Sequence, residues 1–231
     1  LFFRIAGTRR MRIERLSCLP GAEAARGVAV IIDVFRAFTC APLLIRLGAH
    51  TLLLEADIAR CLSLRGDAVR VGERNEEPIE GFDLPNSPFL ILRAGQARFA
   101  GRTVALRPTS GVAGALTALG HADAVLLASY INAQATAAYL SGCGASLVSL
   151  VAMGTHGETP APEDERCGDY IESLLRGGTY DHVAAAAEIL SSDTARRLFT
   201  AEKAALPGAD PAVCLQRGLF EHPVRAGAAS G

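Results

Sequence analysis

The sequence predicts an α/β protein with three layers, α/β/α, in which helices cover both faces of a mostly buried sheet. Short aliphatic runs alternate with stretches of helical length along most of the chain. The first strong run, GVAVIIDV (27–34), is almost continuously apolar, which is typical of a strand buried on both faces. Beyond Pro162 the spacing becomes helical up to about Arg217, so we expect a helical C-terminal third without further strands.

Each further strand and helix is predicted from the same two patterns. The strands that we expect after the first are short apolar runs at residues 50–56, 68–73, 102–107, 124–129 and 145–153. The expected helices between them lie at residues 36–49, 110–120 and 132–142. The first of these helices contains Pro42, which is tolerated best in the first turns, and it ends at Gly48.

The fold pattern begins at Met11 with MRIERL, and we predict one α/β domain over residues 11–231. A chain of 231 residues that is 50% hydrophobic can form one substantial core. LFFRIAGTRR (1–10) precedes the pattern, so we predict that it is a dispensable N-terminal extension. An extra edge element of the fold is the alternative.

Charge and cysteine usage exclude several function classes. The formal net charge of −1 argues against nucleic acid or an anionic membrane as the main partner. The six cysteines are scattered without a CxxC pair, as is typical of buried, reduced thiols. No apolar run approaches the length of a membrane span. We therefore expect a cytoplasmic protein, and the sequence leaves a homo-oligomer open.

Acidic residues crowd the stretch GERNEEPIEGFDLPNSP (72–88). They are Glu73, Glu76, Glu77, Glu80 and Asp83. Three prolines and Gly81 indicate a shaped turn rather than a helix. A solvated acidic loop and a loop that helps to hold a metal ion are both consistent with this composition.

Carboxylates also recur where strands end. Asp33 closes the first buried strand, Glu73 closes the third, and the pair Glu163–Asp164 follows the last. One such carboxylate alone is explained by helix capping, but ligands of α/β sheets bind beyond the carboxyl ends of the strands. Hard carboxylate oxygens suit Mg²⁺, so this recurrence favours a magnesium site.

Candidate anion donors occupy similar positions. Arg36 lies three residues after Asp33, Ser110 precedes a predicted helix, and SYINA (129–133) joins a strand to a helix. Carboxylates on one side of a cleft and anion donors on the other would suit metal-assisted phosphoryl transfer.

Other catalytic templates do not fit. CAPLLIR (40–46) has the Cys-x5-Arg spacing of cysteine phosphatases, but its apolar residues lie in a predicted helix that cannot ring a phosphate with amides. No glycine-rich nucleotide loop occurs. His156, in a glycine-flanked loop, is the one histidine placed for acid–base work, and a surface-loop role is its alternative.

Six segments, in order, resemble the 2-phosphosulfolactate phosphatase family. They are IDVFRAFT (32–39), GERNEEPIEGFDLPNSP (72–88), TSGVAGAL (109–116), SYINA (129–133), GTHG with PEDERCGDYIE (154–172) and SSDTARRL (191–198). The similarity runs from about Met11 to Val224. It implies a Mg²⁺-dependent acid-type phosphatase with a three-layer fold that converts 2-phospho-3-sulfolactate to sulfolactate and phosphate, a step towards coenzyme M or sulfolactate. The acidic loop would then help to build the cleft, chiefly through Glu73 and Asp83.

The residues and the resemblance together predict a site. Asp33 and Arg36 are the predicted catalytic residues, and Asp33, Glu73 and Asp164 are the predicted Mg²⁺ ligands. The small anionic phosphoester is predicted to contact Arg36, Thr39, Asp83, Asn86, Ser87, Thr109, Ser110, Gly111, Ser129 and Asn132. The nucleophile is either water or Asp33, and Arg36 either pairs with an acid of the 73–83 loop or binds a substrate oxygen.

One segment departs from the family pattern. The family usually has T-N-G-T-R where this chain has Thr109-Ser110-Gly111-Val112-Ala113, which removes an amide, a hydroxyl and a guanidinium. The exact substrate therefore stays open. Two alternatives to the phosphatase are a non-catalytic anion-binding homologue and a hydrolase or lyase that acts on a related sulfonated or carboxylated acid.

Overall fold

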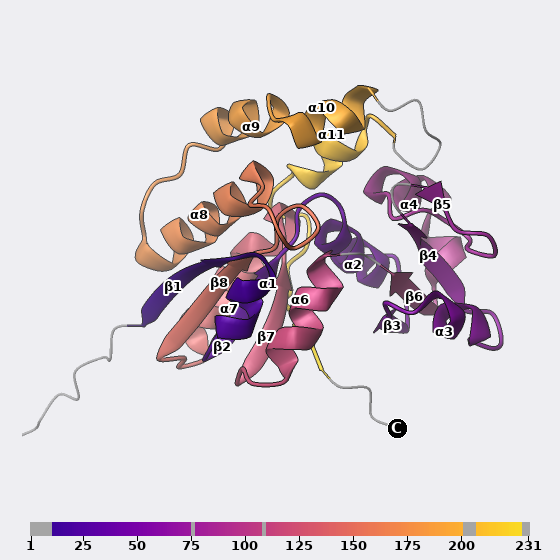
Figure 1. The fold of residues 1–231 in the computed structure, drawn as a ribbon, viewed down its shortest axis with the longest axis horizontal. Coiled ribbons are helices and arrows are strands. Elements are labelled where there is room, and N and C mark those ends of the chain that lie inside the picture. Colours follow the sequence, from indigo (N-terminus) through magenta and orange to yellow (C-terminus); the bar gives the residue numbers. More distant parts are fainter. Residues whose placement is uncertain (1–10, 75–76, 108–109, 201–206, 228–231) are drawn as a thin grey trace, which may run out of the picture.

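The computed structural model describes residues 11–74, 77–107, 110–200 and 207–227. The predicted extension 1–10 and Thr109 lie outside these residues. Helices flank the strands on both faces, as the α/β class requires, and this prediction is confirmed (Figure 1). No helix in the described ranges combines the length and the apolar character needed to cross a membrane.

The described strands divide between two sheets, which the sequence patterns did not separate. The five-stranded sheet has the order β1 (Arg12–Ser17), β8 (Leu147–Ala152), β2 (Val28–Ile32), β7 (Ala124–Ala128) and β9 (Val224–Ala226). Its first four strands are parallel, and β9 pairs antiparallel with β7. The four-stranded sheet has the order β3 (Thr51–Leu54), β6 (Thr103–Arg107), β4 (Val69–Arg74) and β5 (Glu77–Pro78).

Strand β9 shows that the expectation of no strand beyond Pro162 is wrong. Its three residues, VRA, form no apolar run from which a strand could be predicted. They pair with the otherwise open edge of β7, and a short edge strand of this kind depends on its neighbour rather than on its own sequence.

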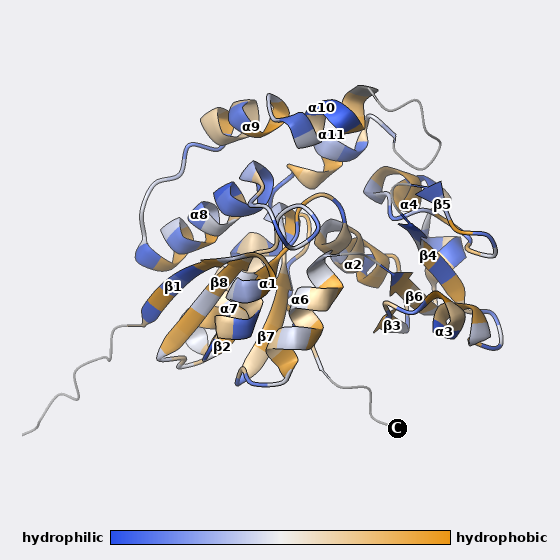
Figure 2. Ribbon diagram, viewed as in Figure 1, coloured by the Kyte–Doolittle hydropathy of each residue, from blue (hydrophilic) through white to orange (hydrophobic). Residues whose placement is uncertain are grey.

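Strand β2 shows how helices cover the five-stranded sheet on both faces. All five of its residues are buried, and successive side chains point to opposite faces. Val28, Val30 and Ile32 belong to the cluster on the side of α7 (Ala133–Gly142) and α8 (Pro162–Arg176). Ala29 and Ile31 belong to the cluster on the side of α1 (Cys18–Ala24) and α6 (Ser110–Leu119). Strands β2, β7 and β8 of this sheet are accordingly among the most hydrophobic parts of the molecule (Figure 2).

Helix α2 (Ala37–Arg46) connects the cores of the two sheets (Figure 1). Its first residues, Ala37 and Phe38, pack in the α1–α6 cluster, whereas Leu43 and Leu44 pack with the second sheet and with α4 (Pro88–Ala94). Cys40 is completely buried within this helix. The rejection of a cysteine phosphatase loop is therefore confirmed, since burial raises the pKa of the Cys40 thiol well above its usual value.

The remaining helices complete the cover. Those not introduced above are α3 (Ile58–Ser63), α5 (Gln96–Phe99), the 3₁₀ turn η1 (Tyr130–Asn132), α9 (His182–Leu190), α10 (Asp193–Thr200) and α11 (Asp210–Cys214). Helices α8 to α11 form the predicted helical C-terminal third, apart from β9. The cysteines are all free, and each is buried except the exposed Cys143.

Candidate active site

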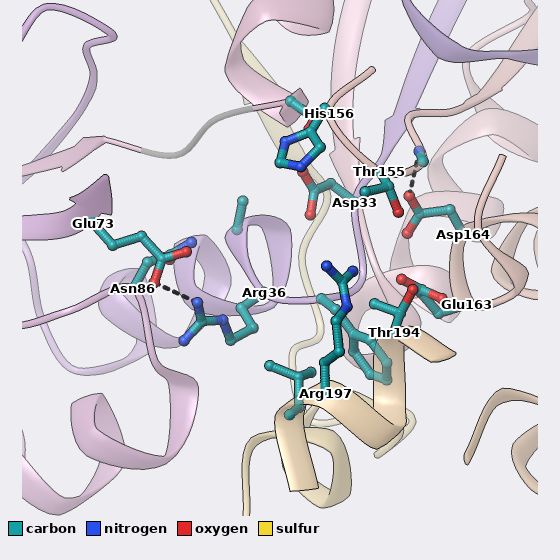
Figure 3. Close-up of a pocket in the computed structure, with 15 residues that line it drawn as sticks. Asp33, Arg36, Glu73, Asn86, Thr155, His156, Glu163, Asp164, Thr194 and Arg197 are labelled. Atoms are coloured by element: carbon teal, nitrogen blue, oxygen red, sulfur yellow. Dashed lines mark hydrogen bonds and ion pairs between the residues drawn. The ribbon is translucent and has the colours of Figure 1, made fainter. Parts of the chain in front are cut away.

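A cavity of about 100 Å³ lies where strands of both sheets end. The segments after β2, β4 and β8 each supply part of its wall, and the starts of α6 and α8 and one face of α10 supply the rest (Figure 3). The polar lining residues are Asp33, Arg36, Glu73, Asn86, Ser110, Thr155, His156, Glu163, Asp164, Thr194 and Arg197. The parallel strands β2 and β8 direct their carboxyl ends to the same edge, so residues far apart in sequence meet there.

Three buried carboxyl groups share one side of the cavity. Burial raises the pKa of Asp33 to about 6, although backbone amides of Gly111 and Ala37 oppose the shift. Burial, with a contribution from Asp33, raises the pKa of Glu163 to about 7, although Arg197 opposes it. Each group is close enough to resist ionisation of the others. A bound cation or shared protons would relieve this repulsion.

Asp164 holds two strand ends together. Its Oδ1 accepts a hydrogen bond from the Val34 amide at 2.7 Å, and its Oδ2 accepts one from the Gly154 amide at 2.8 Å. Burial and the neighbouring Asp33 and Glu163 raise its pKa well above the usual value. Asp164 therefore fixes the loops after β2 and β8 against the start of α8.

Glu163 differs from Asp164 in one respect. Its Oε2 is buried and has no hydrogen-bond partner within the described residues. An unpartnered carboxylate oxygen in a cavity is costly unless a cation, a proton or a ligand satisfies it. Asn86, on the other wall, likewise has a buried Oδ1 without a partner. The cavity thus contains acceptors on both walls.

Arg36 lies between two carboxylates. Its Nη2 donates to Glu73 Oε2, and its Nη1 lies 3.4 Å from Asp210 Oδ2 (Figure 3 shows the first pair). The side chain is almost completely buried and lines the cavity. The ion pair with an acid of the 73–83 loop, one of the two roles left open for Arg36, is present. Its contact with a substrate stays a prediction.

The start of α6 is shaped around Asp33. A Cβ added at Gly111 would lie 2.7 Å from Asp33 Oδ2 and within 3.0 Å of the Phe38 ring, so only glycine fits there. The Gly111 amide forms a hydrogen bond with Asp33 and favours its ionised form. Ser110, buried beside it, lines the cavity. The TSG segment therefore contributes a donor to a carboxylate as well as a hydroxyl to the cavity.

Six predicted substrate contacts lie outside the cavity lining within the described residues. They are Thr39, Asp83, Ser87, Gly111, Ser129 and Asn132. Thr39 donates to Val34 O at 2.9 Å, and Ser129 donates to Phe38 O at 3.0 Å. Asn132 bonds the Ser129 amide and Leu127 O. Polar residues at these strand ends satisfy nearby backbone groups, because a buried backbone group without a partner is costly.

Asp83 and Ser87, two others of this set, hold loops in place. Asp83 accepts from the Arg70 amide at 2.7 Å and pairs with Arg98. Ser87 caps α4, since its Oγ accepts from the Leu90 amide at 3.2 Å. Their hydrogen bonds account for the polar side chains without a ligand.

Several lining residues were not among the predicted site residues. Thr194 and Arg197 reach the cavity from α10, and Figure 3 shows Arg197 directed between Asp33 and Glu163. The only signal for them was the segment SSDTARRL, whose resemblance assigned no roles. Glu163 was noticed only as the neighbour of Asp164.

His156 lies at the cavity in a tight loop. Its φ is +57°, and the flanking Gly154 and Gly157 have φ of +64° and +72°. Thr155 and Thr159 close the loop by a 2.8 Å hydrogen bond from amide to carbonyl. A non-glycine residue in this region of φ is uncommon and is over-represented at functional sites. His156 and Asp33 both line the cavity (Figure 3).

Within the described residues, no group of three or more His, Cys, Asp or Glu side chains is arranged to hold a metal ion. Of the three predicted ligands, Glu73 is paired with Arg36, and both oxygens of Asp164 accept backbone amides. Mg²⁺ usually retains several waters and takes one or two carboxylates together with substrate phosphate. Asp33 and Glu163 fit that smaller requirement.

Comparisons with known proteins agree on one family. The family model described as 2-phosphosulpholactate phosphatase matches residues 16–207. A protein of Deinococcus radiodurans named probable 2-phosphosulfolactate phosphatase is 35% identical over 169 residues, which are 72% of this chain and 69% of that protein. Proteins with the same name from Bacillus subtilis and Gloeobacter violaceus are each 30% identical, over 83% and 74% of this chain and 83% and 72% of their own lengths.

Proposed function

The chain belongs to the 2-phosphosulfolactate phosphatase family, and we propose that it is a phosphoric monoester hydrolase whose substrate is a small anionic phosphoester, with 2-phospho-3-sulfolactate as the first candidate. The observation that carries this proposal is the cavity itself. It gathers the buried carboxyl groups of Asp33 and Glu163 with the guanidinium groups of Arg36 and Arg197. Phosphoryl transfer depends on this combination, since the reacting group carries negative charge that must be positioned and neutralised.

We include Mg²⁺ in the proposal, with Asp33 and Glu163 as its protein ligands and Asp164 as the residue that orients them. Bound Mg²⁺ would supply Lewis-acid neutralisation of the phosphoryl oxygens. The support is the unpartnered Glu163 Oε2 beside a second buried carboxyl group. Glu73 is left out of this revised set because it already pairs with Arg36.

In the proposed reaction a water molecule attacks phosphorus. As the new P–O bond forms, the water proton passes to an oxygen of Asp33, whose carboxylate is oriented by two backbone amides. The ester P–O bond breaks, and the leaving oxygen takes a proton from His156. Arg197 and Ser110 contact the phosphoryl oxygens, and Arg36 contacts the second anionic group.

Phosphate release from a panel of phosphorylated hydroxy acids, with added Mg²⁺ or with EDTA, tests the proposal. We expect turnover of phosphosulfolactate or a close carboxylated analogue, and loss of turnover in EDTA that Mg²⁺ restores. Binding of the panel without turnover would favour the non-catalytic anion-binding homologue. Release of a product other than inorganic phosphate would favour the lyase.

A role in the formation of sulfolactate or coenzyme M, and a cytoplasmic location, are part of the same proposal. Their support is family membership together with the lack, in the described ranges, of a helix able to cross a membrane.

A further inference from the structure

Asp210, the first residue of α11, joins three segments that are distant in sequence. Its Oδ1 accepts hydrogen bonds from Ser87 Oγ at 2.7 Å and from the Phe89 amide at 3.1 Å, at the start of α4. Its Oδ2 lies 3.4 Å from Arg36 Nη1. The side chain is completely buried and does not line the cavity. A carboxylate this deep needs an explanation, because burial of an ionised group is costly unless it is paired.

We infer that Asp210 is a positioning residue for anion binding: it fixes the Arg36 guanidinium at the cavity without itself contacting the substrate. The inference rests on the proposed function in one respect, since it assigns Arg36 to an anionic group of the substrate. None of the predicted site residues belongs to α11, so this role brings the C-terminal helical segment into the site.

The geometry of a guanidinium explains why two carboxylates are used. An arginine side chain is long and flexible, and one ion pair leaves the planar head free to turn about the contact. Arg36 is held at Nη2 by Glu73 and at Nη1 by Asp210. Two contacts on different nitrogens define the plane, and the plane defines where the N–H groups point. Glu73 comes from β4 and Asp210 from α11, so two elements far apart in the sequence fix Arg36.

The two oxygens of Asp210 have different partners, and this separates positioning from a purely structural role. Oδ1 accepts hydrogen bonds at the start of α4, next to the cavity residue Asn86, whereas Oδ2 pairs with Arg36. Asp210→Asn can retain an oxygen acceptor for Ser87 and Phe89 while it replaces the charged contact to Arg36 by an amide. The substitution therefore removes the positioning contact and spares most of the structural one.

A double-mutant cycle tests the inference. The four proteins are wild type, Asp210→Asn, Arg36→Lys and the double variant, each with Mg²⁺ present. Two quantities are measured: kcat/KM on the best substrate of the panel, and the Kd of inorganic phosphate by calorimetry. We expect each single change to weaken both quantities about tenfold, and the double variant to be no worse than Arg36→Lys by more than about threefold. Asp193→Asn, an exposed acid on α10, is the matched control and should resemble wild type.

Independent action would overturn the inference. In that case the two effects multiply to about a hundredfold, or Asp210→Asn lowers the melting temperature while kcat/KM and phosphate affinity are unchanged. If Asp210→Asn does not fold, Asp210→Ser replaces it in the same cycle. Coupling in phosphate binding without turnover would uphold the inference and reject the phosphatase. Turnover without coupling would do the reverse, and a wild type that neither binds phosphate nor turns over substrate would reject both.

Discussion

The loop between β4 and α4 and the start of α8 are both rich in carboxylates, yet they differ in burial and in use. Of the loop acids in the described residues, only Glu73 lines the cavity; Glu77 and Glu80 are exposed, and Asp83 pairs with Arg98. The acid pair Glu163–Asp164 lines the cavity and is almost completely buried. Glu76 lies outside the described residues. The density of acids in the sequence was therefore a poorer guide to the site than their position at a strand or helix end.

The free-energy cost of burying a charge explains the difference. An exposed carboxylate costs little free energy and contributes little to stability, because water screens its charge. A buried carboxylate is costly, and it persists at a site where a cation or a proton compensates it. The raised pKa values of Asp33 and Glu163 are consistent with that condition at the cavity.

The largest effect is expected from Glu163→Gln. The change keeps the size of the side chain but removes the charge whose oxygen is unpartnered in the cavity. We expect kcat/KM to fall about a hundredfold or more, equivalent to about 2.7 kcal/mol of transition-state stabilisation. Glu80→Gln, in the exposed part of the acidic loop, is the control and should stay within about twofold of wild type. Similar losses in both variants would remove the distinction between the two regions.

The second prediction concerns stability, pH and metal. Asp33 and Glu163 have pKa values raised to about 6 and about 7, so the folded protein binds more protons than the unfolded chain between about pH 4 and 7. The free energy of unfolding of the metal-free protein should therefore fall as the pH rises through this window. Mg²⁺ should raise the melting temperature by several degrees at about pH 8 and much less at about pH 5.

Calorimetric melts with Mg²⁺ or EDTA at the two pH values measure this effect. In Glu163→Gln the pH dependence should be weaker and the response to Mg²⁺ smaller. A melting temperature that is indifferent to Mg²⁺ at both pH values would contradict the proposed ligand pair.

Much of the fold was predictable because it depends on local pattern. The parallel strands β2, β7 and β8 are buried on both faces, so their sequences are continuous apolar runs. The division into two sheets was not predictable, since it depends on which strand edges meet. Short elements such as α1, α3 and α5 were missed because helices of four to seven residues derive their stability from packing.

The site was predictable to a similar extent and for a similar reason. Asp33, Arg36, Ser110 and Asp164 line the cavity, and each lies at or just after the end of a strand or at the start of a helix. The contribution of α10 and of Asp210 depends on how the C-terminal helices pack against loops about a hundred residues or more away. No local pattern encodes that distance.

The third prediction concerns His156, which belongs to neither acidic region and so tests whether carboxylates alone explain catalysis. His156→Asn removes the imidazole, and asparagine tolerates the positive φ at this position better than most residues. We expect kcat to fall about tenfold with KM little changed, because the proton supplied to the leaving oxygen matters in the transition state. Substrates with a more acidic leaving group should lose less.

His50→Asn, on the exposed turn before β3, controls for the loss of a histidine and should have the kcat of wild type. If His156→Asn turns over all leaving groups at the wild-type rate, the imidazole is a loop residue without a catalytic role.

A smaller effect is expected from Asp83→Asn. This variant tests an acid of the loop that lies outside the cavity lining. Asp83 pairs with Arg98 and accepts from the Arg70 amide, so the change should cost about 1 kcal/mol of unfolding free energy. At about 4 °C or less per kcal/mol for a chain of this size, the melting temperature should fall by a few degrees. The value of kcat/KM should stay within about twofold. A tenfold loss of kcat/KM would instead indicate that Asp83 contacts the substrate.

The smallest effect is expected from deletion of residues 1–10. These residues include Arg4, Arg9 and Arg10, so the deletion tests whether they supply a basic partner for the exposed acids. The described fold begins with β1, whose Arg12 amide donates to Ser146 O at 2.9 Å, and β1 is the edge strand of the five-stranded sheet. If the exposed acids need no partner from residues 1–10, removal of these residues should change neither kcat/KM nor the melting temperature by more than about 2 °C. Deletion of residues 1–17 also removes β1 and its pairing with β8, so it should lower the melting temperature by far more and shows what loss of an edge element looks like. A fall of more than about 4 °C in the shorter deletion, reduced at high salt, would mean that these arginines neutralise the acidic loop, because only an electrostatic contact is screened in that way.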